Sequence, residues 1–307
     1  MNHNVQGIVV PILTPLNKDE TLCLEALSPL ISHIIEGGAD GIFQVSTTGE
    51  YARLSHAERH MLAEHTMKYA KGKIATYLGV SDASTKQAVF NAKKMAELSP
   101  DYLVCSLPYY YPVKDDREII SFFEEIVNAT PLPLVLYNIP ITCGASITIS
   151  AIKELMKIKQ IVGIKDSSGD LSYFKQLIEL KKLRSDFAVL SGDESTMSPC
   201  ARLGCDGFVP SLANVFPKLF TKYQKYIWED KFEKADEVYA QIKRMNESNL
   251  YSGSWMSAIV WRKEALYQMG IIPAHMTKPY VALSAEDKVK VSVHIAMYNK
   301  LFSERSQ

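Results

Sequence analysis

The segment IVGIKDSSGD, residues 161–170, is the stretch from which the fold can be read. An apolar run of strand length ends on a lysine and then breaks into small polar residues, which predicts a buried strand with an amine at its carboxyl end. Side chains alternate along a strand, so Gly163 and Lys165 are expected to face one side together. Burial in general disfavours the charged form of a lysine, and a neutral amine is the form that adds to a carbonyl carbon to give a Schiff base. A lone lysine at a strand end more often points to water, so the chemical interpretation depends on the rest of the chain.

Similar apolar runs alternate with amphipathic stretches over the first three quarters of the chain. Eight strands are predicted, at residues 7–10, 41–45, 74–78, 102–105, 134–137, 161–165, 188–190 and 207–209. Each is followed by a predicted helix, at residues 22–36, 57–69, 86–97, 118–128, 149–156, 173–183, 195–203 and 216–228. Eight such units indicate an α/β protein with a (β/α)8 barrel. The competing open sheet normally stops at about five or six strands, and the chain has no G-x-G-x-x-G motif.

Beyond residue 228 the strand pattern ends and three helices are predicted, at residues 231–249, 255–269 and 285–302. The predicted domain organisation is therefore a catalytic barrel over residues 1–228 and a C-terminal helical region over residues 229–307. Ser55 with Glu58, and Ser84 with Gln87, have the spacing of helix-capping boxes.

Composition argues against several kinds of partner. Lysine plus arginine and aspartate plus glutamate both number 34, and the isoelectric point is about 7.0, which gives no electrostatic reason to expect nucleic acid or an anionic membrane. The chain has no long apolar run and no signal-type N-terminus, so a cytoplasmic location is expected. The five cysteines lack metal or redox spacing and are expected to be reduced thiols.

In a barrel of this kind the reactive groups come from the carboxyl ends of the strands and the loops that follow them. The loop after the second strand, STTGE at residues 46–50, offers hydroxyls and backbone N–H groups that can hold a carboxylate. Three tyrosines at residues 109–111 follow the fourth strand, between two prolines. Tyr137 ends the fifth strand about one βα unit before Lys165, so the two side chains are expected to face each other and Tyr137 to move protons near the amine.

These segments together resemble the pyruvate-dependent class I aldolases, which include dihydrodipicolinate synthase, N-acetylneuraminate lyase and 2-keto-3-deoxygluconate aldolase. The resemblance rests on S-T-T-G-E at residues 46–50, P-Y-Y at 108–110, Y-N-I-P at 137–140 and G-I-K-D at 163–166, and it extends from the first strand to the C-terminal helices.

The resemblance implies roles for particular residues. Lys165 would form the Schiff base with pyruvate or the 2-oxo acid, and Tyr137 would be the acid and base at the reacting bond. Thr47 and Tyr110 would complete a proton relay, and Thr47 with Thr48 would bind the pyruvyl carboxylate. No metal or other cofactor is implied, since the protonated imine is the electron sink. Family members commonly form homotetramers, as dimers of dimers, with the second tyrosine of P-Y-Y close to or across the dimer interface.

The second substrate is less constrained. Dihydrodipicolinate synthases carry an arginine two residues after the proline of Y-N-I-P, where this chain has Thr142, so a carboxylate at that end of the substrate is not expected. The segment 192–195, GDES, preserves only part of the N-acetylneuraminate lyase pattern, and Pro210 stands where that lyase has glycine. We therefore expect a 2-keto-3-deoxy sugar acid to be cleaved reversibly to pyruvate and an aldehyde. The predicted substrate-binding residues are Thr47, Thr48, Gly163, Thr142, Ser167, Glu194, Val209 and Ser211.

Other interpretations stay open at this point. They are a dihydrodipicolinate synthase that condenses pyruvate with aspartate semialdehyde, an N-acetylneuraminate lyase, a dehydratase that uses the same Schiff base, and a non-catalytic protein that binds a 2-oxo acid. His56, His60 and Glu64 share one helix face, but no further ligand of matching spacing is evident, so we interpret them as a solvated surface.

Overall fold

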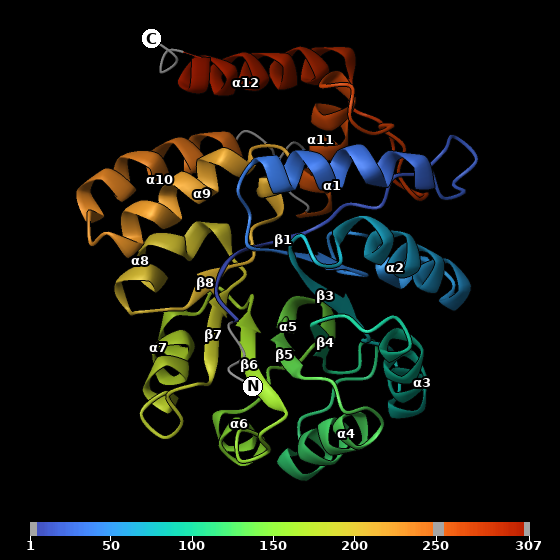
Figure 1. Cartoon of the computed structure of the whole chain (residues 1–307), viewed down its shortest axis with the longest axis vertical. Coiled ribbons are helices and arrows are strands. Elements are labelled where there is room, and N and C mark those ends of the chain that lie inside the picture. Colours follow the sequence, from blue (N-terminus) through green and yellow to red (C-terminus); the bar gives the residue numbers. More distant parts are fainter. Residues whose placement is uncertain (1–4, 248–254, 304–307) are drawn as a thin grey trace.

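The computed structural model describes residues 5–247 and 255–303. Eight parallel strands close into a barrel in which each strand pairs with the next along the chain and β8 pairs with β1. The predicted (β/α)8 barrel is confirmed, and each strand lies within two residues of its predicted position (Figure 1). The strands are β1 Gly7–Pro11, β2 Gly41–Gln44, β3 Ala75–Gly79, β4 Tyr102–Ser106, β5 Leu134–Asn138, β6 Ile161–Asp166, β7 Ala188–Ser191 and β8 Gly207–Phe208.

Helices that follow the strands cover the outside of the barrel (Figure 1). They are α1 Leu27–Glu36, α2 His56–Ala70, α3 Thr85–Ala96, α4 Asp116–Asn128, α6 Ile149–Leu155, α7 Leu171–Leu180, α8 Met197–Arg202 and α9 Pro217–Trp228. The sequence does not predict α5, Pro140–Cys143, which is a single turn. Proline at its first position and Gly144, with φ of 67°, just after its end fix its two boundaries.

The predicted capping boxes at the N-termini of α2 and α3 differ in detail. At α2 the Ser55 hydroxyl accepts a hydrogen bond from the Glu58 N–H, and the Glu58 carboxylate accepts one from the Ser55 N–H, so the full capping box is present. At α3 the Ser84 hydroxyl accepts from the Gln87 N–H, but the Gln87 side chain accepts from the Ser84 hydroxyl instead of its backbone. Only half of the predicted box forms there.

The C-terminal region consists of α10 Phe232–Glu247, α11 Trp255–Gln268 and α12 Ala285–Ser303, close to the three predicted helices. Helix α10 lies alongside α9, and α12 lies beyond α11 at the end of the molecule (Figure 1). Trp261 on α11 is fully buried, and its ring meets Phe216 edge-on at 6.1 Å between centroids. None of the helices in residues 5–247 and 255–303 combines the length and the apolar character needed to cross a bilayer.

The burial of Trp261 predicts that α11 depends on packing against the barrel. Trp261→Ala should lower the free energy of unfolding by about 3–5 kcal/mol, because it leaves a large cavity beneath the helix. Trp228→Ala, at a side chain that is 54% exposed on α9, is the matched control and should change it by less than about 1 kcal/mol. Urea unfolding followed by circular dichroism measures both, and equal effects would contradict this account of α11.

Candidate active site

A cavity of about 270 Å³ opens at the carboxyl ends of the strands, with Lys165 in its wall. Its lining includes most of the residues predicted from sequence: Thr47, Thr48, Tyr137, Lys165, Ser167, Glu194, Val209 and Ser211. Lys165 and Tyr137 are paired residues of β6 and β5, as expected, and each is 5% exposed. The Lys165 Nζ lies 4.1 Å from the centre of the Tyr137 ring and 5.4 Å from that of Phe43. A cationic nitrogen at this position gains from both aromatic faces.

The space around Lys165 depends on Gly192, which the sequence does not single out. A Cβ on Gly192 would lie 2.2 Å from the Ser167 Oγ and 2.6 Å from the Lys165 Cε, so any side chain there would displace the lysine. Gly163 is among the predicted substrate-binding residues, but it does not line the cavity, and a Cβ there would lie 2.6 Å from the Ala188 carbonyl oxygen. This glycine instead permits close packing of β6 against β7.

The hydroxyl loop, residues 46–50, carries Thr47 and Thr48 and has a strained backbone conformation at its end. Glu50 ends the loop with φ of 60°. The Thr14 hydroxyl donates to the Gly49 carbonyl over 2.6 Å, and the Gly49 N–H donates to the Ser46 hydroxyl over 3.2 Å. A Cβ on Gly49 would lie 2.9 Å from the Ile12 carbonyl oxygen, so the loop needs glycine at this point. These contacts fix the loop that carries the two threonine hydroxyls into the cavity.

The same loop is tied to the C-terminal region by a buried ion pair. Lys263 on α11 places its Nζ 2.6 Å from the Glu50 carboxylate, and neither side chain is exposed. The Thr277 hydroxyl and N–H donate to the other Glu50 oxygen, and Lys263 also donates to the His275 carbonyl. Burial lowers the pKa of Lys263, and the adjacent Glu50 charge opposes this shift. Removing one partner would leave the other charge buried and uncompensated.

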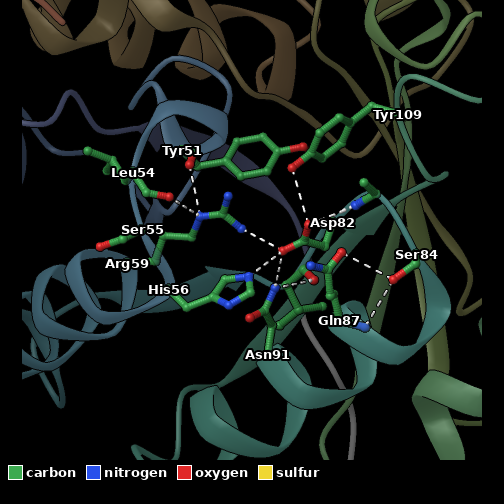
Figure 2. Close-up of polar contacts among 12 residues, drawn as sticks. Tyr51, Leu54, Ser55, His56, Arg59, Asp82, Ser84, Gln87, Asn91 and Tyr109 are labelled. Carbon is green, nitrogen blue, oxygen red and sulfur yellow. Dashed lines mark hydrogen bonds and ion pairs between the residues drawn. The ribbon is translucent and has the colours of Figure 1, made fainter.

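A second group of polar contacts centres on Asp82, after β3 (Figure 2). Arg59 donates to the Asp82 carboxylate over 2.8 Å, and the Tyr109 hydroxyl donates to it over 3.3 Å. Arg59 also donates to the Tyr51 carbonyl oxygen, beside the hydroxyl loop (Figure 2). The cluster therefore joins the segments that follow β2, β3 and β4. It also fixes Tyr109, which directly precedes the predicted relay residue Tyr110.

His56 and Asn91 complete the Asp82 cluster. The His56 Nε2 lies 2.9 Å from the Asp82 carboxylate, so His56, whose side chain is 39% exposed, has a buried partner as well as contact with solvent. In the described chain, no group of His, Cys, Asp and Glu has the arrangement of a metal site. Burial raises the pKa of Asp82, but hydrogen bonds from the Ala83 N–H, His56 and Asn91, together with the Arg59 charge, outweigh it and hold this pKa below its usual value.

Tyr110 and Thr142 lie apart from Lys165. Both line a neighbouring cavity of about 410 Å³, which shares Thr47 with the first. Tyr110 is 80% exposed and has a φ of 81°, a strained value for a tyrosine. The Thr142 hydroxyl donates to the Ile139 carbonyl oxygen, which closes the single turn of α5. This chain alone therefore does not bring either residue to the amine, and the relay role of Tyr110 stays a prediction.

Arg262 is a cavity residue that the sequence does not predict. It lies next to Lys263 on α11, and its Nη2 is 2.9 Å from the Glu194 carboxylate. The other Glu194 oxygen accepts from the Leu212 N–H over 2.6 Å. Glu194 thus lines the cavity as predicted, but both of its oxygens already have protein partners. Two adjacent cations within the apolar stretch AIVWRKEAL, residues 258–266, were the available signal, because buried cations normally have partners.

A cavity with a buried lysine and several hydroxyl groups, at the carboxyl end of a (β/α)8 barrel, is the arrangement of a barrel enzyme. Comparison with known proteins identifies the protein family. Residues 4–297 match the model of the dihydrodipicolinate synthetase family. The chain is 31% identical to 4-hydroxy-tetrahydrodipicolinate synthase of Neisseria meningitidis, over 94% of this chain and 96% of that protein. It is 30% identical to an uncharacterised DapA-like lyase of Pyrococcus horikoshii, over 93% and 98% respectively.

A solved structure agrees with the sequence relatives. Dihydrodipicolinate synthase from Bacteroides thetaiotaomicron superposes with a TM-score of 0.90 at 29% identity, covering 97% of this chain and 100% of that one. The chain therefore belongs to the dihydrodipicolinate synthetase family, whose members are pyruvate-dependent lyases. The family expected from the S-T-T-G-E, P-Y-Y, Y-N-I-P and G-I-K-D segments is confirmed.

The Asp82 cluster predicts a pH-dependent contribution to stability. The pKa of folded Asp82 lies below its unfolded value of about 3.9, so its stabilisation is complete above that pH and is lost as the pH falls through the folded-state pKa. Asp82→Asn should lower the free energy of unfolding by about 1–3 kcal/mol at pH 7. The difference from the wild type should shrink below about pH 4. Thermal unfolding across pH 3–7 measures this, and a difference that is constant with pH would contradict it.

Proposed function

We propose that this protein is a class I pyruvate-dependent aldolase that reversibly cleaves a 2-keto-3-deoxy sugar acid to pyruvate and an aldehyde. One observation carries the proposal: Lys165 is buried in the wall of a cavity, and its amine faces the ring of Tyr137 while Thr47 and Thr48 line the same space. This arrangement offers a nucleophile, a proton-transfer group and a carboxylate site within one cavity.

In the proposed reaction the Lys165 Nζ adds to the C2 carbonyl of the 2-oxo acid. Tyr137 returns a proton to the carbinolamine oxygen, water leaves, and a protonated imine remains. The positive nitrogen of this imine would lie against the faces of Tyr137 and Phe43, which favour a cation. The hydroxyls and backbone N–H groups of the loop that carries Thr47 and Thr48 would hold the carboxylate.

The imine then provides the electron sink for carbon–carbon cleavage. Tyr137, as the phenolate, takes the proton of the C4 hydroxyl, the C3–C4 bond breaks, and its electron pair moves into the imine to form an enamine. The aldehyde leaves, the enamine is protonated at C3, and hydrolysis of the new imine releases pyruvate and the free lysine. The condensation direction is the reverse of these steps. No oxidation or reduction takes place.

The identity of the aldehyde is a separate part of the proposal. Ser167 and Ser211 line the cavity with Val209, and Thr142 stands where a synthase of this family has its arginine. These residues favour hydroxyl groups over a carboxylate at the far end of the substrate. A second candidate is 4-hydroxy-tetrahydrodipicolinate synthase, which condenses pyruvate with aspartate semialdehyde, because the Neisseria meningitidis relative bears that name.

The assembly is also proposed. An 80% exposed tyrosine in a strained backbone conformation is better explained by a partner than by solvent, so Tyr110 is expected to contact a second subunit and complete the relay there. We propose a homotetramer built as a dimer of dimers. All five cysteines are free, which is compatible with the proposed cytoplasmic location.

The Schiff base can be tested by reduction. Wild-type protein treated with pyruvate and borohydride should gain the mass of a reduced pyruvyl adduct, and peptide mapping should place it on Lys165. Lys165→Ala should gain no adduct and should lose more than about a thousandfold in kcat, because the covalent route is removed. An adduct that persists in Lys165→Ala would move the reactive amine elsewhere.

Gly192 gives an independent test of the cavity geometry. Gly192→Ala should reduce the rate of pyruvate trapping at least about tenfold, because the new methyl group occupies the position of the Lys165 side chain. Gly163→Ala should instead act mainly on stability, through the backbone of Ala188. Trapping rates and thermal unfolding, measured on both variants, distinguish the two effects. Normal trapping in folded Gly192→Ala would contradict the assignment.

A further inference from the structure

Helix α11 brings a guanidinium into the wall of the Lys165 cavity. Arg262 is one residue from Lys263, whose ion pair with Glu50 fixes the helix against the hydroxyl loop. Its side chain is 4% exposed, so the guanidinium is out of bulk water although it borders the cavity. The Arg262 position is therefore set by the same contact that sets the loop carrying Thr47 and Thr48.

The charge of Arg262 is already compensated. Its Nη2 lies 2.9 Å from the Glu194 Oε2 and 3.3 Å from the Asn246 Oδ1, and the Glu194 side chain is 9% exposed. The remaining Glu194 oxygen accepts from the Leu212 N–H, so the carboxylate cannot turn away without losing that bond. The pair is thus fixed in place and has no net charge.

Part of the guanidinium has no protein partner. The Nη2 donates to Glu194 and Asn246, whereas the Nη1 makes no hydrogen bond to a described residue. Because Arg262 lines the cavity and its other N–H donor, the Nε, is buried, the Nη1 is the donor that a ligand oxygen in the cavity can meet. The bonds of Nη2 to Glu194 and Asn246 hold the plane of the guanidinium in place.

We propose that Arg262 is a specificity-determining residue that donates from its Nη1 to a hydroxyl oxygen of the aldehyde portion of the substrate. This inference rests on the proposed function, since it assigns the group that recognises the part beyond the pyruvyl unit. Arg262 would thereby select polyhydroxylated, uncharged aldehydes over aldehydes that lack hydroxyls.

The same pair disfavours an anionic aldehyde. A carboxylate placed beside Arg262 would add a negative charge to a site where Glu194 has already used the positive one, and Asp193 lines the same cavity. A buried charge without its own partner is strongly disfavoured. A neutral hydroxyl needs only the free N–H and carries no such cost. Aldehydes with a distal carboxylate, such as aspartate semialdehyde, should therefore be poor acceptors.

The test is a comparison of acceptor aldehydes in the condensation with pyruvate. The variant is Arg262→Met combined with Glu194→Gln, which removes the guanidinium without leaving Glu194 as an unpaired buried charge. The probes are glyceraldehyde, propionaldehyde and aspartate semialdehyde. Wild type should prefer glyceraldehyde over both others in kcat/KM. In the double variant the glyceraldehyde-to-propionaldehyde ratio of kcat/KM should fall at least about tenfold, mainly through KM.

A matched control separates this effect from a general loss of stability. Arg202 on α8 and Asp236 on α10 form an arginine–carboxylate pair outside the cavity, with both side chains nearly half exposed. Arg202→Met with Asp236→Asn should leave the aldehyde ratio unchanged. An unchanged ratio in the Arg262 double variant, or a wild-type preference for aspartate semialdehyde, would overturn the inference.

The outcome for Arg262 can be told apart from the outcome for the proposed function. Borohydride trapping of pyruvate on wild-type Lys165 tests the Schiff base without any aldehyde. Successful trapping with an unchanged aldehyde ratio would refute the role of Arg262 and leave the Schiff base intact. Absence of trapping in wild-type protein would refute the proposed function itself, and the specificity inference with it.

Discussion

The buried ion pair between Glu50 and Lys263 is the contact on which the arrangement of the site depends. It joins the loop after β2 to α11, elements that are more than 200 residues apart in the chain. Both charges are fully buried, so either side chain alone would be strongly unfavourable, and the hydroxyl loop and the helix must be in place together. Bonds from Thr277 to the same carboxylate extend the constraint to the segment that precedes α12. The C-terminal region thereby contributes directly to the shape of the barrel mouth.

The residue next to Lys263 on the same helix connects this ion pair to the cavity. Arg262 pairs with Glu194 from the segment after β7, so two consecutive residues of α11 reach the loops after β2 and β7. Those loops border the cavity that contains Lys165, and Gly192 provides the space in which the lysine side chain lies. In this account the barrel supplies the reactive groups from its strand ends, and α11 supplies the part of the wall that meets the rest of the substrate. A division of this kind lets one barrel accept different aldehydes through changes in loops and in one helix.

Much of the fold could be predicted from sequence because the spacing of apolar residues and the number of strands leave few alternative folds. The eight strands and the three C-terminal helices lie close to their predicted positions, whereas α5 was missed because its signals are one proline and one glycine around a single turn. The opposition of Tyr137 and Lys165 follows from strand periodicity and is observed. The roles of Gly163 and Gly192 could not be separated in this way, since both are glycines near strands and only the distances to Ala188 and Lys165 distinguish them. Arg262 was missed for a related reason: ion pairs between distant segments leave no periodic signal.

The central claim is that Lys165 is the residue that binds the 2-oxo acid covalently, with its carboxylate at the hydroxyl loop. A crystal structure of the protein soaked with pyruvate tests this claim most directly. The account predicts continuous electron density from the Lys165 Nζ to C2 of the pyruvyl group, with the carboxylate within hydrogen-bond distance of Thr47 and Thr48. A free Lys165 amine with pyruvate bound elsewhere, or an adduct whose carboxylate points away from both threonines, would contradict it.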